Sequence, residues 1–212
     1  MNQVEANTIT INSIAYNLND LEQYVWKKLV NGAIKKKNGC RTMCVATISK
    51  SHECNVRTVV NRKVDELQKK IFFHTDVRSR KFADLQNDNQ VSLLFYDTRQ
   101  NMQVAIKASA KIHTNNELAQ NRWQATSLKA RLAYMTVDEP NTKSALPTLG
   151  YADQYLIQVP TEAESDAFKL NFAVIECDAH SIEFLWLHFS GNRKANFNYK
   201  NGVIENAYWA VP

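Results

Sequence analysis

Segment 75–81 gathers hydroxyl and cationic side chains of the kind that bind phosphate. Thr75 closes an apolar run, and Ser79, Arg80 and Lys81 follow where a helical pattern begins. A helix start presents free backbone N–H groups and the positive end of the helix dipole, and cations add charge-assisted hydrogen bonds. The residue types and their spacing therefore predict a phosphate site.

A second polar set precedes this segment on a predicted strand, residues 57–65. Because side chains alternate along a strand, one face receives Arg57, Val59 and Asn61. The other face receives Thr58, Val60 and Arg62. This alternation divides the polar side chains of the strand between its two faces.

The surrounding segments must position these residues, and most of these segments are predicted to be short strands. The β-branched and apolar runs predict strands at 42–50, 57–65, 71–76, 90–97 and 101–113. Residues 65–70 form a hairpin-length loop, and residues 81–87 have helical spacing. Five or six short strands with short connections are typical of an antiparallel barrel.

Helical patterns flank this predicted barrel on both sides. The first starts at an N-cap, Asn19 or Asp20, and ends at Gly39, and we expect residues 1–18 to form a lead-in segment. The second starts at Thr114 or Asn115, with Glu117 fitting a capping box, and runs to residue 132.

The C-terminal part predicts two hairpins. The first joins 172–177 to 180–188 through Asp178 and Ala179, and the second joins 193–199 to 203–209 through Asn201 and Gly202, a strong type I′ signal. Between helix and hairpins, residues 138–149 form a proline-containing loop, and residues 154–159 are either a short strand or part of that loop.

Composition sets broad limits on the class of protein. The chain has 212 residues, 44% of them hydrophobic, and a formal net charge of +5. Its four cysteines form no C-x-x-C pair and fit no zinc module, so we expect no metal site and free thiols in a reduced, cytoplasmic setting. The sequence shows no signal peptide and no apolar run of the roughly 20 residues that a membrane helix needs.

Five stretches in order carry a family resemblance: residues 42–47, 57–65, 73–81, 85–95 and 102–106. Together they resemble the flavin-binding core of the pyridoxamine 5'-phosphate oxidase-like family, the FMN-binding split barrels. The resemblance is close over residues 42–112 and loose beyond them. It implies a mainly β fold with α-helices, a six-stranded antiparallel split barrel flanked by helices.

The resemblance also implies one domain over residues 1–212. Its parts would be a lead-in and helix (1–40), the flavin-binding barrel core (41–113), and a helix, loop and C-terminal hairpins (114–212).

The same resemblance implies FMN as cofactor and assigns its contacts. The residues implied are Arg57, Thr58, Val59, Val60, His74, Thr75, Ser79, Arg80, Lys81 and Gln103. In this family pattern Arg57 donates toward the pyrimidine edge of the flavin, and Gln103 hydrogen-bonds the ring. A tyrosine is usual where this chain has His74.

The substrate residues of the oxidases proper are poorly reproduced. Arg62 stands where the family has lysine, Ala105 replaces an arginine, and the helix reads Trp123, Ser127, Arg131 in a changed order. We therefore expect a conserved cofactor pocket and a rebuilt substrate pocket. The candidate substrate contacts are Arg62, Ser127, Arg131 and Arg193.

Family members hold the flavin at a dimer interface, which implies a homodimer here. Candidates for the contribution of the second subunit are Trp186, Arg193 and the loop around Lys143 and Ser144.

Three functions remain open on the sequence. The first is an FMN-dependent oxidoreductase acting on a small molecule, with no side chain marked as a general base. The second is a non-catalytic flavin- or haem-related binding or stress protein, and pyridoxamine or pyridoxine 5'-phosphate oxidase itself is a further alternative. A nucleic-acid-binding barrel is the third, suggested by the charge and by Phe72 and Phe73. The cations are not interleaved with these aromatics, so we expect no nucleic-acid partner and no membrane partner.

Overall fold

The computed structural model describes residues 7–212. The strands are β1 (Ile9–Ile11), β2 (Ile14–Tyr16), β3 (Thr42–Ile48), β4 (Cys54–Val60), β5 (Lys63–Asp65), β6 (Lys70–Asp76), β7 (Gln90–Asp97), β8 (Met102–His113), β9 (Phe172–Trp186), β10 (Arg193–Lys200) and β11 (Val203–Ala210). The α-helices are α1 (Leu18–Ile34), α2 (Arg80–Asn87), α3 (Glu117–Ala125), α4 (Leu128–Arg131) and α5 (Glu162–Asp166). The 3₁₀ turns are η2 (Gly39–Arg41), η3 (Leu132–Tyr134), η4 (Asp153–Leu156) and η5 (Lys169–Asn171).

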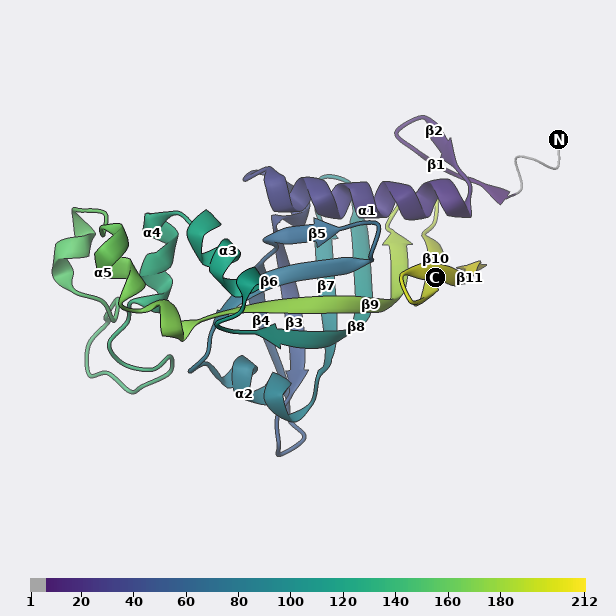
Figure 1. Cartoon of the computed structure of the whole chain (residues 1–212). Helices are drawn as coiled ribbons and strands as arrows, with labels where there is room; N and C mark the ends of the chain where they lie inside the picture. Colours follow the sequence, from purple (N-terminus) through teal and green to yellow (C-terminus); the bar gives the residue numbers. More distant parts are fainter. Residues whose placement is uncertain (1–6) are drawn as a thin grey trace.

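The predicted split barrel is confirmed. An antiparallel sheet runs in the order β11-β10-β9-β8-β7-β3-β4, and β6 pairs with the first half of β9 and with β5. Among residues 7–212, β4 and β6 share no hydrogen-bond ladder, and this gap is the split. The inner faces close on a core that includes Val45, Phe73, Phe95 and Phe184. β10 and β11 extend the sheet beyond the barrel (Figure 1).

Helix α1 lies across the barrel and buries one apolar face (Figure 1). Its N-cap is Asn17, whose side chain accepts a hydrogen bond from the backbone N–H of Asp20. The cap predicted at Asn19 or Asp20 is therefore wrong, because the helix begins within one turn before those residues. The helix ends at Ile34, before Gly39, because the chain must turn into η2. A Cβ at position 39 would lie 2.3 Å from the Asp97 carboxyl carbon, which explains the glycine there.

The single strand predicted over 57–65 is wrong, because it breaks after Val60. Asn61 is fully buried, and its side-chain amide donates to the carbonyl oxygens of Leu29 (2.9 Å) and Cys40 (3.3 Å). These bonds pull the chain out of the sheet toward α1. Within β4 the predicted alternation holds, since Val59 packs on the core and Thr58 is exposed.

The hairpin predicted over 172–188 is also wrong. β9 is one continuous strand through Asp178 and Ala179. Asp178 pairs with Lys70 on one side and with Ser109 on the other. The neighbouring strands therefore provide hydrogen-bond partners for the backbone N–H and C=O groups of this segment, and no turn forms. The irregularity is confined to the β8–β9 ladder, where the register shifts beside His180. The hairpin of β10 and β11 is confirmed, with Asn201 and Gly202 both at positive φ.

Residues 117–171, which we call the lobe, form a separate layer at one end of the barrel (Figure 1). The long helix predicted to residue 132 is divided into α3 and α4, because the backbone at Thr126 is extended (φ −82°, ψ 122°). Its cap is Asn116 rather than Thr114 or Asn115.

The lobe is attached to the sheet by a small aromatic cluster. Trp123, Tyr134 and Phe172 pack edge to face with centroids 5.0–6.0 Å apart, together with Phe72 of β6. Segment 154–159 contains the turn η4 instead of a strand. In residues 7–212 we find no helix long and apolar enough to cross a membrane. The same residues contain no group of three or more metal-ligating side chains.

Candidate cofactor site

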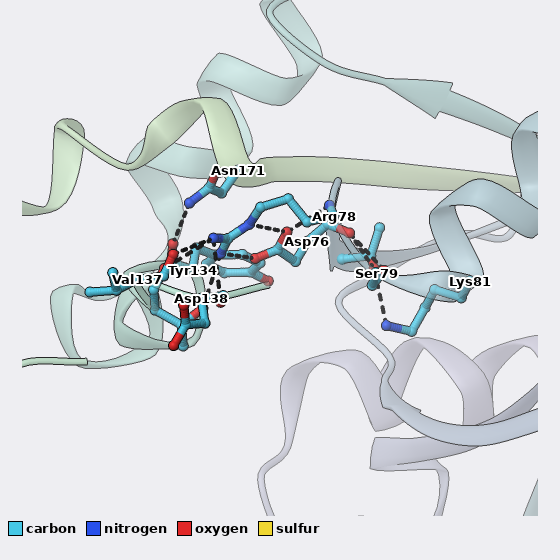
Figure 2. Close-up of polar contacts among 10 residues, drawn as sticks. Asp76, Arg78, Ser79, Lys81, Tyr134, Val137, Asp138 and Asn171 are labelled. Carbon is cyan, nitrogen blue, oxygen red and sulfur yellow. Dashed lines mark hydrogen bonds and ion pairs between the residues drawn. The ribbon is translucent and has the colours of Figure 1, made fainter. Parts of the chain in front are cut away.

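The turn between β6 and α2 brings three of the predicted residues together. The hydroxyls of Thr75 and Ser79 lie 3.0 Å apart, and the Lys81 ammonium donates to the Thr75 hydroxyl at 3.2 Å. Ser79 is the N-cap of α2, but its side chain makes no capping bond and donates instead to the Asp76 carbonyl at 2.7 Å. Figure 2 shows Ser79 and Lys81 on this turn. Two hydroxyls and one ammonium therefore converge at a helix start.

The site is electrostatically incomplete. Burial lowers the pKa of Lys81, and the nearby Arg57 guanidinium lowers it further, while Asp76 acts in the opposite direction. Within residues 7–212 the Lys81 ammonium has no ion-pair partner. One ammonium without a counter-ion and two hydroxyls form a donor set that a phosphate group would complete. Arg80, the remaining predicted cation, is exposed at the first position of α2.

Arg57 faces the interior side of β4 and points toward α2. Its guanidinium donates to the Thr47 hydroxyl at 2.6 Å and lies 3.5 Å from the Asp84 carboxylate. Asp84 also accepts from Thr47 (2.6 Å) and Asn55 (3.2 Å), so it is a fixed anchor. The predicted contact of Arg57 with a flavin edge stays a prediction. Sequence reasoning missed Asp84, because an aspartate within a short polar helix gives no sign of burial.

Gln103 does not join Arg57 within one chain. Register places Thr58 opposite Cys44 and Arg57 opposite Val45, so these two β4 residues lie on different faces of the sheet. Gln103 pairs with Tyr96, and both point outward, away from the core-facing Val104.

The outer face holds a groove of about 480 Å³. Its lining includes Cys44, Val56, Leu94, Ala105 and Tyr208, from strands β3, β4, β7, β8 and β11. Thr58 and Val60 alternate onto the same side as Val56, whereas Arg57 and Val59 face inward. The predicted flavin-contacting residues of β4 are thus divided between the two faces.

His74 lies on β6 but faces the lobe, opposite to Thr75. Its ring contacts Phe172 edge to face at 4.8 Å, and neither ring nitrogen has a hydrogen-bond partner among the described residues. Burial lowers its pKa to about 3, and the Arg62 and Arg122 guanidiniums contribute to that shift. His74 is therefore neutral at pH 7, and its predicted cofactor contact stays a prediction.

The depressed pKa of His74 predicts a loss of stability in acid. Below pH 6.5 the unfolded chain binds a proton that the folded chain does not bind until about pH 3, so stability falls through that window and is unaffected above it. The cost at pH 5 is about 2 kcal/mol. Urea unfolding at pH 7 and pH 5 should show a smaller difference for His74→Phe than for the wild type. His52→Asn, at an exposed position, is the control; equal differences in all three proteins would contradict the assignment.

The four predicted substrate residues are not brought together. Arg131 is buried, donates to Ser165 and Asp166 at 3.0 and 3.1 Å, and lies over the Trp123 ring at 4.7 Å. These contacts commit Arg131 to holding the lobe together. Ser127 is exposed at the start of α4.

Arg62 lies near His74 and Tyr134, since its charge lowers the pKa of both. Arg122 of α3, which sequence reasoning missed, joins this group, and burial lowers its pKa. No pattern in the sequence distinguishes it from a solvated helix residue. Burial raises the pKa of Tyr134 to about 12, so its hydroxyl stays protonated.

Arg193 lies in a different groove, of about 590 Å³, beside Trp186 and His188. The Trp186 and His188 rings stack at 4.3 Å, and Arg193 donates to the carbonyls of Gly191 and Asn192 in its own loop. None of the residues lining this groove belongs to the 75–81 turn. Residues Lys143 and Ser144 are exposed in the long loop of the lobe.

Comparisons with known proteins find similar sequences and similar folds. The family model described as pyridoxamine 5'-phosphate oxidase matches residues 31–149. The curated pyridoxine/pyridoxamine 5'-phosphate oxidase 2 of Arabidopsis thaliana is 31% identical over 120 residues, which are 52% of this chain and 61% of that protein. The chain thus matches less than two thirds of this relative's length.

Two solved structures share the fold over most of the chain. A pyridoxamine 5'-phosphate oxidase-related, FMN-binding protein from Nostoc punctiforme matches with a TM-score of 0.69 and 17% identity, covering 90% of this chain and 96% of that one. PhzG from Burkholderia lata, solved with tetrahydrophenazine-1-carboxylic acid, matches with a TM-score of 0.67 and 13% identity, covering 90% and 91%. At these identities the likeness concerns the fold.

Proposed function

The chain belongs to the pyridoxamine 5'-phosphate oxidase family, and from this premise we propose that it binds FMN and acts as an FMN-dependent oxidoreductase on a small organic molecule. The single observation that carries the proposal is the convergence of Thr75, Ser79 and Lys81 at the start of α2, with no counter-ion for Lys81 among residues 7–212. A flavin phosphate supplies the missing negative charge.

The roles of the chain's own residues follow from their positions. Lys81 and the Thr75 and Ser79 hydroxyls hold the phosphate, and Arg80 adds charge from the exposed first turn of α2. Arg57, oriented by Asp84 and Thr47, places a cation where the ring edge would lie. FMN supplies the hydride chemistry when bound, and the protein binds, orients and tunes it.

The substrate is proposed only as a small molecule. Arg131 is committed to Asp166 and Ser165, and Ala105 offers no cation on the outer face. Both positions therefore depart from the pattern of the oxidases proper. We therefore do not assign that substrate.

We also propose a homodimer in the cytoplasm with the flavin at the subunit interface. In support, Gln103 lies on the sheet face opposite to Arg57, so one chain does not present both residues on the same side and a second subunit would supply one of them. That face exposes Val56, Leu94 and Tyr96 around the groove of about 480 Å³. Trp186, Arg193 and the loop at Lys143 and Ser144 would contribute from the partner in the same way.

A cofactor spectrum with mass identification tests these proposals. We expect purified protein, after incubation with FMN, to show flavin absorbance, to release FMN on denaturation and to sediment as a dimer. Bleaching by a nicotinamide donor or an amine substrate, followed by reoxidation in air, would demonstrate turnover. Colourless protein would contradict the cofactor assignment, and coloured protein without turnover across a broad substrate screen would contradict the enzymatic one. A monomer that binds FMN would contradict the shared site.

A further inference from the structure

Arg78 lies between the phosphate-site residues in sequence, yet its side chain reaches the lobe. Its guanidinium pairs with both oxygens of Asp76 at 3.0 and 2.7 Å. It also donates to the carbonyls of Thr136 (3.1 Å) and Val137 (3.3 Å), to the Thr136 hydroxyl (3.0 Å) and, at 3.5 Å, to the Asp138 carbonyl. Figure 2 shows this side chain between the β6–α2 turn and the lobe. We call Asp76 and Arg78 the clamp.

The clamp shares its backbone with the phosphate site. The Asp76 carboxylate accepts from the Arg78 N–H at 2.8 Å, and the Asp76 carbonyl accepts from the Ser79 N–H (3.1 Å) and hydroxyl (2.7 Å). A phosphate oxygen at this site would compete for the Ser79 hydroxyl proton. Binding there would therefore change the bonding of the turn that holds Asp76 and Arg78.

Charge provides a second link between clamp and phosphate. The Asp76 side chain is only 7% exposed, and Arg78 neutralises it. Without Arg78, a buried carboxylate would lie unpaired one residue from Thr75, where it would repel an incoming phosphate. The clamp thus makes the site able to accept an anion while it holds the lobe.

The clamped segment lies between the aromatic cluster and the exposed loop of the lobe. It follows Tyr134, whose ring packs on Phe172 and whose carbonyl accepts from Asn171 at 2.9 Å. It also leads into the exposed loop, which closes where the Val137 N–H donates to the Gly150 carbonyl at 2.9 Å. The position of residues 134–150 relative to the cofactor site therefore depends on the clamp.

We infer that Arg78, together with Asp76, is a positioning residue that couples occupancy of the phosphate site to the lobe, so that FMN orders residues 136–150 and riboflavin does not. The inference rests on the proposed function, because it needs FMN to bind at Thr75, Ser79 and Lys81. A ligand shifts a conformational equilibrium only through contacts that differ between the two states. The phosphate of FMN supplies such contacts. FMN and riboflavin share the same flavin ring, so ring contacts do not distinguish them.

Hydrogen exchange of residues 136–150 tests the inference in the apo protein, with riboflavin and with FMN. In the wild type we expect FMN to slow exchange by about tenfold or more and riboflavin to change it little. Asp76→Asn/Arg78→Met restores charge balance without the clamp, so we expect FMN affinity within about threefold of the wild type but no protection. Arg78→Lys should restore part of the protection.

Lys129→Ala, an exposed lobe residue, is the matched control and should behave as the wild type. Equal protection by riboflavin and FMN, or protection in the double variant equal to that of the wild type, would overturn the inference and leave the proposed function standing. A wild-type chain that binds no FMN would overturn both.

Discussion

Replacing Lys81 by methionine is expected to weaken FMN binding by about 10- to 100-fold and to leave riboflavin binding nearly unchanged, since a hydrogen bond to a charged group contributes about 1.5–3 kcal/mol. Methionine keeps the length of the side chain and removes the ammonium that donates to Thr75. Riboflavin lacks the phosphate, so the ratio of the two dissociation constants isolates the phosphate contact from general damage to the pocket.

The same substitution is expected to leave the apo protein as stable as the wild type or more stable. Burial and the Arg57 guanidinium both disfavour the charged form of Lys81, so its removal relieves an unfavourable arrangement. Fluorescence titration with each flavin and thermal unfolding of the apo protein measure the two effects. Lys111→Met, at an exposed position of β8, is the matched control. Equal weakening for both flavins would place the phosphate elsewhere.

Removal of the Glu22 carboxylate is expected to give the largest change in stability, about 3–5 kcal/mol for Glu22→Leu, because it leaves the Lys69 ammonium, on a side chain only 15% exposed, without its ion-pair partner. Glu22 lies on α1 with its side chain 5% exposed, 2.8 Å from the Lys69 ammonium. It also accepts from the Tyr199 hydroxyl at 2.9 Å, and that hydroxyl accepts from Trp26 at 3.0 Å. The network joins α1, the β5–β6 turn and β10.

Urea unfolding of single and double variants separates the pair from its surroundings. Glu22→Leu/Lys69→Met should lose much less stability than the single variant, because no unpaired charge remains. Glu205→Gln is the control, since its ion pair with Lys200 is 3.7 Å long and exposed, and such pairs contribute about 0–1 kcal/mol. A single variant that loses no more than this control would show that the network does not hold α1 to the barrel.

Some strands and turns could be predicted from the sequence because they depend on local chemistry. β7, with alternating burial from Gln90 to Asp97, was predicted at its observed bounds, and so was the turn at Asn201 and Gly202. Side-chain alternation and positive-φ turn residues act over a few positions, so one sequence suffices to see them. The convergence of Thr75, Ser79 and Lys81 is also a local feature that the sequence can predict, because the strand end and the helix start that carry them are adjacent in the chain.

The features that were missed depend on partners distant in sequence. Asp178 and Ala179 resemble a turn, yet strands on both sides hold them in β9. Asn61 ends β4 because α1 offers a carbonyl at Leu29.

The features of the candidate site also fall into those set by local sequence and those set by distant contacts. The sequence by itself determined that Thr75, Ser79 and Lys81 meet at a helix start, since these residues lie close together in the chain. Only the tertiary structure decided that Arg131 holds the lobe, that Asp84 orients Arg57 and that Gln103 faces the other side of the sheet. The direction of a side chain and the neutralisation of a buried charge depend on which distant segment packs against it, and no local pattern encodes that choice.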